Sequence, residues 1–132
     1  MKPEYMLDTD TVSYWFRDEG RVRVNVGRRE PAALCISAVT LAELRFGATQ
    51  KHAAKLHRLI DDFVGQVAVM PFNRHTADHY AIVASELATS GTPIGDFDTI
   101  IAAHAIALNL TLVTNNLKHF SRVPGLRIEN WA

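Results

Sequence analysis

The hydrophobic residues of the chain fall into two kinds of pattern that take turns along the sequence. Short continuous apolar runs predict strands at 5–7, 34–38, 67–70 and 111–114, with an edge strand around 126–129. Apolar residues spaced three, four, seven and eight apart predict helices. We expect one helix to begin at 8–10, directly after the first strand, and further helices to span 40–47, 52–64, 73–90 and 100–108. Strands alternating with helices favour an α/β fold, with a mainly parallel central sheet and helices on both faces as three layers.

Length and composition narrow the class of protein. The chain has 132 residues without a repeat or a low-complexity tract, so we expect a single domain over 1–132. One cysteine, Cys35, cannot form an internal disulfide, and its place in a predicted buried strand indicates packing. No apolar run approaches the roughly 20 residues of a membrane span, and no basic, apolar leader is evident at the start. We therefore expect a cytoplasmic protein with no membrane contact.

The charge balance restricts how the chain can contact nucleic acid. Fourteen Lys and Arg residues balance 14 Asp and Glu residues, which disfavours binding through a general positive excess. A local surplus of two positive charges lies between 17 and 30, and it fits either a solvated helix or a surface that faces phosphates. The aromatic run at 14–16 could stack on bases, but adjacent positions on a helix favour division between the core and a protein interface.

Acidic and amide side chains lie just after the predicted strands or in the first turn of the helix beyond, where we expect the fold to bring them to one edge of the sheet. The residues are Asp8, Asp10, Glu43, Asp96, Asp98 and Asn116. Carboxyl ends of parallel strands meet at one edge of a sheet, so we expect these groups to gather there. Two like charges about 5 Å apart repel by roughly 3 kcal/mol at an effective dielectric of about 20. Proton uptake or a divalent cation must relieve that repulsion, and oxygen-only ligands favour Mg²⁺ or Mn²⁺.

Each of these residues also fits a structural role when it is considered alone. Thr40 and Glu43 match a capping box, in which Glu43 would bind the backbone N–H of Thr40. The other groups that could cap a helix or occupy a turn are Asp8, Asp10, Asp98, Asn115 and Asn116. A purely structural explanation is less convincing when the residues are taken together, because three helices would then place a carboxylate at the same edge.

Three further patterns suggest other chemistry less strongly. The stretch 8–10 resembles the D-x-D motif of haloacid-dehalogenase-like phosphatases, but the later acidic pair of that family is missing. His75 and His79 have zinc-ligand spacing without a third ligand, which favours surface histidines. His104 lies on the most apolar predicted helix, where a hydrogen-bonded core residue is favoured over a general base.

Four stretches, in order, resemble the successive motifs of PIN-domain ribonucleases, and most of all the VapC toxins of bacterial VapBC toxin–antitoxin modules. They are Met6-Leu-Asp-Thr-Asp10, Ile36-Ser-Ala-Val-Thr-Leu-Ala-Glu-Leu-Arg-Phe-Gly47, Pro93-Ile-Gly-Asp-Phe-Asp-Thr-Ile-Ile-Ala-Ala-His104 and Leu112-Val-Thr-Asn-Asn-Leu-Lys-His-Phe120. Position by position, the resemblance implies a catalytic site of Asp8, Glu43, Asp98 and Asn116, in which the three carboxylates hold the metal. Asn116 departs from the acidic residue that many PIN domains have there.

The resemblance also implies a function. It implies Mg²⁺- or Mn²⁺-dependent hydrolysis of RNA, with accessory residues Asp96, Thr9, Thr114 and Asn115. It further implies a homodimer, a VapB-like antitoxin as partner, and DNA contact only through that antitoxin. Enteric VapC toxins cut initiator tRNA at its anticodon loop, which makes tRNA the favoured substrate. The alternative is a non-catalytic PIN-like module that binds RNA or protein.

Overall fold

The computed structural model describes residues 2–132 and places a sheet of five parallel strands at its centre. The strands are β1 (Tyr5–Leu7), β2 (Leu34–Ser37), β3 (Ala68–Met70), β4 (Thr111–Val113) and β5 (Ile128–Glu129). They lie in the order β3-β2-β1-β4-β5, and each neighbouring pair is parallel. The predicted strands and the predicted α/β fold class are confirmed.

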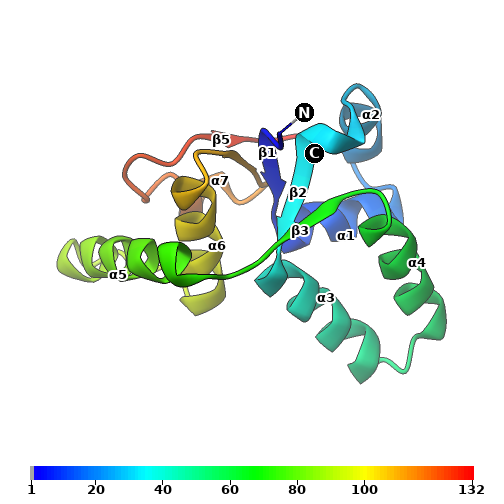
Figure 1. Ribbon diagram of the computed structural model, residues 1–132, viewed down its shortest axis with the longest axis horizontal. Helices are drawn as coiled ribbons and strands as arrows, with labels where there is room; N and C mark the ends of the chain where they lie inside the picture. The colour runs from blue at the N-terminus through cyan, green and yellow to red at the C-terminus, as the bar shows by residue number, and fades with distance from the viewer. Residues whose placement is uncertain (1) are drawn as a thin grey trace.

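Helices cover both faces of this sheet. They are α1 (Thr9–Arg17), α2 (Val22–Gly27), α3 (Ala38–Gln50), α4 (Ala54–Val64), α5 (Arg74–Thr89), α6 (Asp96–Ala107) and α7 (Leu117–Phe120), with a short 3-10 turn, η1 (Pro31–Ala33). Figure 1 shows α1 to α4 on one side of the sheet and α5 to α7 on the other. No helix in the described part of the chain is both long and apolar enough to cross a membrane.

Two hydrophobic clusters fill the space between the sheet and its helices. Successive side chains of a strand point to opposite faces, so neighbouring residues of β1 enter different clusters. Met6 packs in the cluster that contains Ile101 of α6, whereas Leu7 packs in the cluster that contains Phe63 of α4. The predicted three-layer arrangement is therefore confirmed.

The helix α3 begins earlier than predicted. The side chain of Ser37 accepts a hydrogen bond from the Val39 N–H at 3.1 Å and caps the helix, so Thr40 lies inside it. The predicted capping box of Thr40 and Glu43 is therefore wrong. The helix also continues to Gln50, past its predicted end near Gly47, because a glycine inside a helix costs only about 1 kcal/mol relative to alanine.

The helix α6 also begins earlier than predicted, at Asp96 rather than near residue 100. Gly95 precedes it with a φ of 100°, a backbone conformation that suits glycine. Asp98 consequently lies within the first helical turn and does not cap the helix. Asn116 does cap a helix, the short α7, which the apolar pattern did not predict.

β1 lies in the middle of the sheet, where the order in which the chain adds strands reverses. The chain runs from β1 outward through β2 to β3, then returns to the other side of β1 to form β4 and β5. In parallel sheets, ligands bind beyond the carboxyl ends of the strands at such a reversal. Asp8 follows β1 there, and its backbone N–H donates to the Val113 carbonyl of β4 at 3.0 Å.

Candidate functional site

Asp8 is the deepest carboxylate at this edge of the sheet. Its side chain is 4 % exposed, and Oδ1 accepts a hydrogen bond from the Thr11 N–H at 2.8 Å, which caps α1. Burial raises the pKa of Asp8 to about 6, although interactions with the Thr114 and Thr11 side chains lower it. Asp8 thus caps a helix and also brings a poorly solvated carboxyl group to the candidate site.

Glu43 reaches the same edge from α3. The Thr9 hydroxyl donates a hydrogen bond of 2.6 Å to Oε1 of Glu43, linking two helices that follow different strands. Burial raises the pKa of Glu43, and the nearby Asp98 and Asp10 raise it further, while the bond from Thr9 lowers it. Thr9 therefore contacts a carboxylate at this edge.

Asp98 enters the edge from the first turn of α6. Burial raises its pKa, Asp10 adds to the rise, and His119 opposes it. Asp10 also acts on Asp8 and Glu43, so the four carboxyl groups share one electrostatic environment. The structure therefore brings together the carboxylates that the sequence placed far apart.

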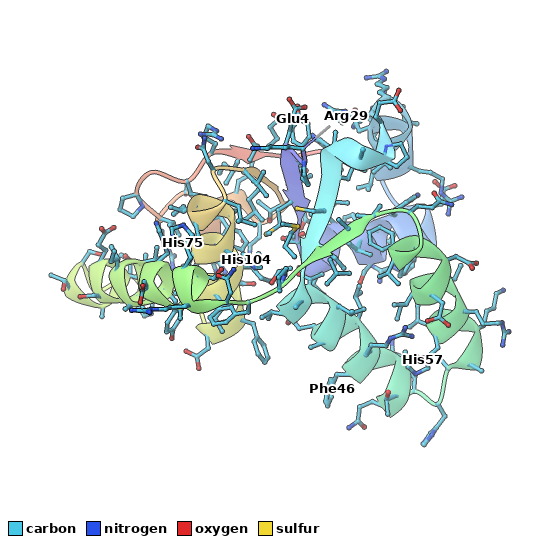
Figure 2. All side chains as sticks on the ribbon, in the orientation of Figure 1. Glu4, Arg29, Phe46, His57, His75 and His104 are labelled. Atoms are coloured by element: carbon cyan, nitrogen blue, oxygen red, sulfur yellow. The ribbon has the colours of Figure 1, made fainter. Side chains whose placement is uncertain are left out.

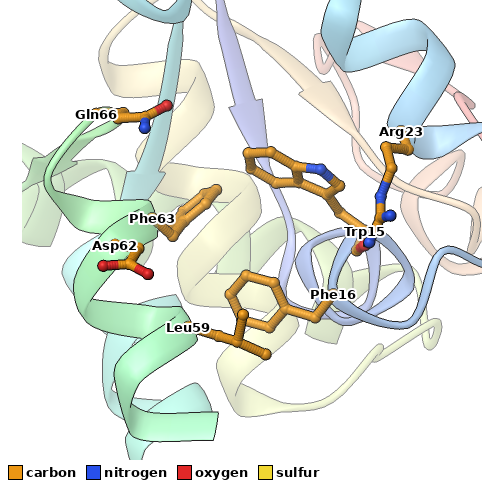
Figure 3. Close-up of a pocket in the computed structure, with 7 residues that line it drawn as sticks. All are labelled: Trp15, Phe16, Arg23, Leu59, Asp62, Phe63 and Gln66. Atoms are coloured by element: carbon orange, nitrogen blue, oxygen red, sulfur yellow. The ribbon is translucent and has the colours of Figure 1, made fainter. Parts of the chain in front are cut away.

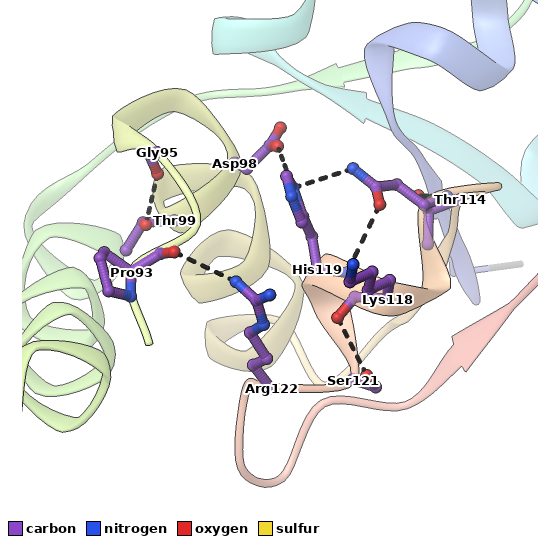
Figure 4. A network of polar contacts seen from close by, with 10 residues as sticks. Pro93, Gly95, Asp98, Thr99, Thr114, Lys118, His119, Ser121 and Arg122 are labelled. Atoms are coloured by element: carbon purple, nitrogen blue, oxygen red, sulfur yellow. Dashed lines mark hydrogen bonds and ion pairs between the residues drawn. The ribbon is translucent and has the colours of Figure 1, made fainter. Parts of the chain in front are cut away.

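Asn116 belongs to a polar network with Thr114 and His119, and Figure 4 shows the His119 ring pointing toward Asp98. The backbone N–H of Asn116 donates to the Thr114 hydroxyl at 3.0 Å, and its Oδ1 accepts from the His119 N–H at 3.4 Å. Its Nδ2 lies 2.9 Å from Nδ1 of His119, which is itself 3.9 Å from Oδ2 of Asp98. Sequence reasoning missed His119, although its position one turn after Asn116 is a usable signal.

Asp10 and Asp96 lie closer to the surface than Asp8, and Asn115 is intermediate in burial. Both aspartates are exposed, in the first turns of α1 and α6, and Asn115 is half-buried before Asn116. Exposed carboxylates in a first helical turn are favoured by the helix dipole. The structure thus gives these two aspartates a helix-stabilising position close to the site.

The donor chemistry at this edge suits a hard cation held by few protein ligands. Across residues 2–132, no group of three His, Cys, Asp or Glu side chains is arranged to hold a metal ion. Mg²⁺ usually binds one or two carboxylates and completes its shell with water and substrate phosphate. The raised pKa values of Asp8, Glu43 and Asp98 reflect poor solvation and mutual repulsion, both of which a divalent cation would offset.

Two hollows flank the carboxylates, and Thr9 and Glu43 line both. One, of about 220 Å³, runs between α1 and α3 and includes the cationic side chains of Arg17 and Lys51. The other, of about 540 Å³, is lined in addition by Ala42, Phe46 and Phe97. The candidate site is thus open on two sides with different chemistry.

A third hollow, of about 210 Å³, lies apart from the carboxylates, between α1 and α4 (Figure 3). Its aromatic residues are Trp15, Phe16 and Phe63, and both Trp15 and Phe16 meet Phe63 edge to face. Trp15 and Phe16 pack partly against the core, as predicted, and also form an apolar surface depression.

The residues that the sequence assigned to structural roles have those roles. His104 is fully buried, and its Nδ1 lies 2.9 Å from the Ser37 hydroxyl. Cys35 is fully buried, which raises its pKa to about 12. Nε2 of His75 lies 3.1 Å from the Ala107 carbonyl, and Nδ1 of His79 lies 3.0 Å from the His75 carbonyl. The two surface rings therefore have backbone partners.

Comparison with known proteins identifies the family. The PIN domain family model matches residues 5–126. A tRNA(fMet)-specific endonuclease VapC of Salmonella typhimurium is 36 % identical over 133 residues, which cover 98 % of this chain and 98 % of that protein. The chain belongs to the VapC ribonucleases of the PIN-domain family. The predicted resemblance is confirmed.

Solved structures of VapC ribonucleases share this fold over nearly the whole chain. DNA-bound VapBC from Salmonella typhimurium superposes with a TM-score of 0.93 at 35 % identity, covering 98 % of this chain and 99 % of that one. VapBC2 from Rickettsia felis, bound to a DNA fragment from its promoter, has a TM-score of 0.88 at 34 % identity, covering 97 % and 98 %. These toxin–antitoxin complexes support the ribonuclease toxin over the non-catalytic module.

Proposed function

We propose that this VapC ribonuclease is a toxin that cuts RNA internally, using Mg²⁺ or Mn²⁺ attracted by Asp8, Glu43 and Asp98 and bound through one or two of these carboxylates, with water and substrate phosphate completing its shell. One observation carries the proposal. Three carboxyl groups from different elements share an edge of the sheet, and the pKa of each is raised. A protein that used these residues only to cap helices would have no need to concentrate poorly solvated acids at one point.

The residues around the carboxylates would hold them in a productive arrangement. When bound, a divalent cation would polarise the scissile phosphate and help a water molecule to lose its proton. Thr9 fixes the Glu43 carboxylate, and the Thr114 hydroxyl accepts from the Asn116 N–H, which positions the Asn116 amide. Asn115 and Asp96 are accessory residues in this proposal.

The substrate we propose is tRNA, and specifically the anticodon loop of initiator tRNA. The support is the tRNA(fMet)-specific activity named for the Salmonella typhimurium relative, which aligns over nearly the full length of this chain. The balanced net charge fits a substrate held by a few local contacts. Arg17 and Lys51, in the hollow beside Glu43, provide such contacts.

We further propose a homodimer in the cytoplasm that is restrained by a VapB-like antitoxin. The structural relatives are VapBC complexes, and those from Salmonella typhimurium and Rickettsia felis are bound to DNA. In our proposal, this chain contacts DNA only through its antitoxin. The apolar hollow between α1 and α4 supports the presence of a protein partner, because it exposes aromatic surface away from the carboxylates.

The experiment that tests the proposed chemistry compares the native chain with Asp8→Asn on total RNA, with Mn²⁺ or Mg²⁺ and with EDTA. Asp78→Asn, an exposed change on α5, is the matched control. We expect cleavage by the native chain and the control, and its loss with EDTA or Asp8→Asn. Cleavage by Asp8→Asn at the native rate would exclude the assigned chemistry, and RNA binding without cleavage would favour the non-catalytic module. Sequencing of the RNA ends identifies the substrate.

A further inference from the structure

We propose that Phe46 and Phe97 form an aromatic clamp that stacks on unpaired RNA bases beside the bond that is cut. The inference rests on the proposed ribonuclease function and adds to it the residues that hold the substrate. Both rings line the hollow of about 540 Å³ that also contains Thr9 and Glu43. The clamp therefore adjoins the carboxylate edge directly.

Neither ring has a structural role that accounts for its position. Phe46 is 66 % exposed and Phe97 is 57 % exposed. Within residues 2–132, neither ring belongs to one of the two core clusters or stacks on another aromatic ring. A single exposed apolar side chain is ordinary, but two phenylalanines in one hollow indicate a surface that binds something.

The backbone ties each ring to a carboxylate of the site. Phe46 follows Glu43 by three residues on α3, so the two side chains share a helix face. Figure 2 shows Phe46 on the side of α3 that faces away from α4. Phe97 precedes Asp98 in the first turn of α6. Since α3 packs against α6, the two rings enter the hollow from two neighbouring helices.

The charges around the site favour a base over a phosphate in this hollow. Its lining combines Ala42 and the two rings with the acidic Glu43, and it includes no cation. The neighbouring hollow shares Thr9 and Glu43 but contains Arg17 and Lys51, which suit phosphates. RNA in a loop exposes bases that can leave their stack, and any base can stack on an aromatic face. We therefore assign bases to the aromatic hollow and backbone phosphates to the cationic one.

The test separates stacking from apolar packing and from cleavage. Phe46→Leu and Phe97→Leu keep much of the apolar volume but remove the aromatic face. Phe97→Tyr is the conservative variant, because it keeps an aromatic ring. Ile82→Ala is the control, because Ile82 is also 57 % exposed and lies on α5 away from the hollow. The probes are a synthetic anticodon stem–loop of initiator tRNA and the same RNA with abasic positions beside the cut.

We expect each leucine variant to raise KM about tenfold, equivalent to about 1.4 kcal/mol, with kcat nearly unchanged. Ile82→Ala should keep the native KM, and Phe97→Tyr should have a KM well below that of Phe97→Leu. On abasic RNA the native chain should lose the same factor, and the leucine variants should lose nothing more. Equal effects of the variants on intact and abasic RNA would overturn the clamp. A fall from dimer to monomer in the leucine variants would also overturn it, because the rings would then bind a second copy.

A binding measurement tests the clamp independently of catalysis. The Asp98→Asn protein is mixed with a stem–loop that carries 2-aminopurine beside the cut, since stacking on a ring quenches its fluorescence. Quenching that is lost in Asp98→Asn with Phe97→Leu supports the clamp, even if the native chain cuts no RNA and the proposed chemistry fails. Binding without quenching, beside normal cleavage by the native chain, overturns the clamp alone.

Discussion

The hydroxyl of Thr9 donates a hydrogen bond of 2.6 Å to the Glu43 carboxylate and so links α1 to α3 at the carboxylate edge. This bond lowers the pKa of Glu43, against the rise caused by burial and by the neighbouring acids. We predict that Thr9→Val raises that pKa and reduces RNA cleavage about tenfold, because groups that orient ligand carboxylates have effects of this size. Thr9→Ser keeps the hydroxyl and should keep the activity. The measurement is the rate of RNA cleavage in Mn²⁺ for each variant. Native activity in Thr9→Val would show that the Thr9 hydroxyl does not contribute to cleavage.

Asp8 should lower the stability of the metal-free protein at neutral pH. Its pKa rises from an ordinary 3.8 to about 6 in the folded state, so folding favours the protonated form. The contribution of Asp8 to stability is therefore greatest below about pH 4 and is lost as pH rises through about 6. We predict that Asp8→Asn, which keeps the N-cap, raises the free energy of unfolding by about 1–3 kcal/mol at pH 7.5.

The measurement is urea unfolding in EDTA at pH 7.5 and again near pH 4. The gain should shrink to roughly half a kcal/mol or less at the lower pH, where Asp8 is protonated in the folded state and partly protonated in the unfolded state. Asp78→Asn, at an exposed position, should change stability by less than about 0.5 kcal/mol at either pH. An equal gain at both pH values would mean that ionisation of Asp8 does not set its effect.

The parts of the fold that depend on local pattern were predictable from the sequence. Short apolar runs such as 34–38 favour a buried strand, and the structure has β2 there. The gathering of Asp8 and Glu43 followed from topology, because they come after β1 and β2, whose ends meet at one edge of the parallel sheet. Asp98 follows no strand and reaches this edge from the start of α6, after α5.

The features that depend on tertiary contacts were not predictable. Ser37 and Thr40 are both good capping residues, so the sequence could not decide where α3 begins. In the structure Ser37 also pairs with Met70 of β3, so it ends a strand while its side chain caps the helix. The contact of His119 with Asp98 likewise depends on how α7 folds back against α6. Such choices are made by packing between distant segments.

Gly47 shows how a local rule can be overridden, and it offers a stability test. It lies inside α3, and an added methyl group would meet no atom within 4 Å. We predict that Gly47→Ala raises the free energy of unfolding by about 0.5–1 kcal/mol, because alanine loses less backbone entropy on forming a helix. Gly91→Ala is the matched comparison and should lower the free energy of unfolding, because Gly91 has a φ of 69° that strains any other residue. Thermal unfolding of both variants measures these changes, and a lower stability of Gly47→Ala than of the native chain would contradict the prediction.

Asn116 has two roles that can be separated by substitution. Its Oδ1 accepts from the His119 N–H and caps α7, while its Nδ2 meets the His119 ring beside Asp98. Asn116→Ala removes both functions and should cost about 1 kcal/mol of stability as well as activity. Asn116→Ser can still cap the helix but has no amide, so we predict near-native stability with cleavage reduced about tenfold. Unfolding and cleavage are measured on both variants. A fully active Asn116→Ser would restrict Asn116 to capping, and the catalytic polar groups would then be the carboxylates alone.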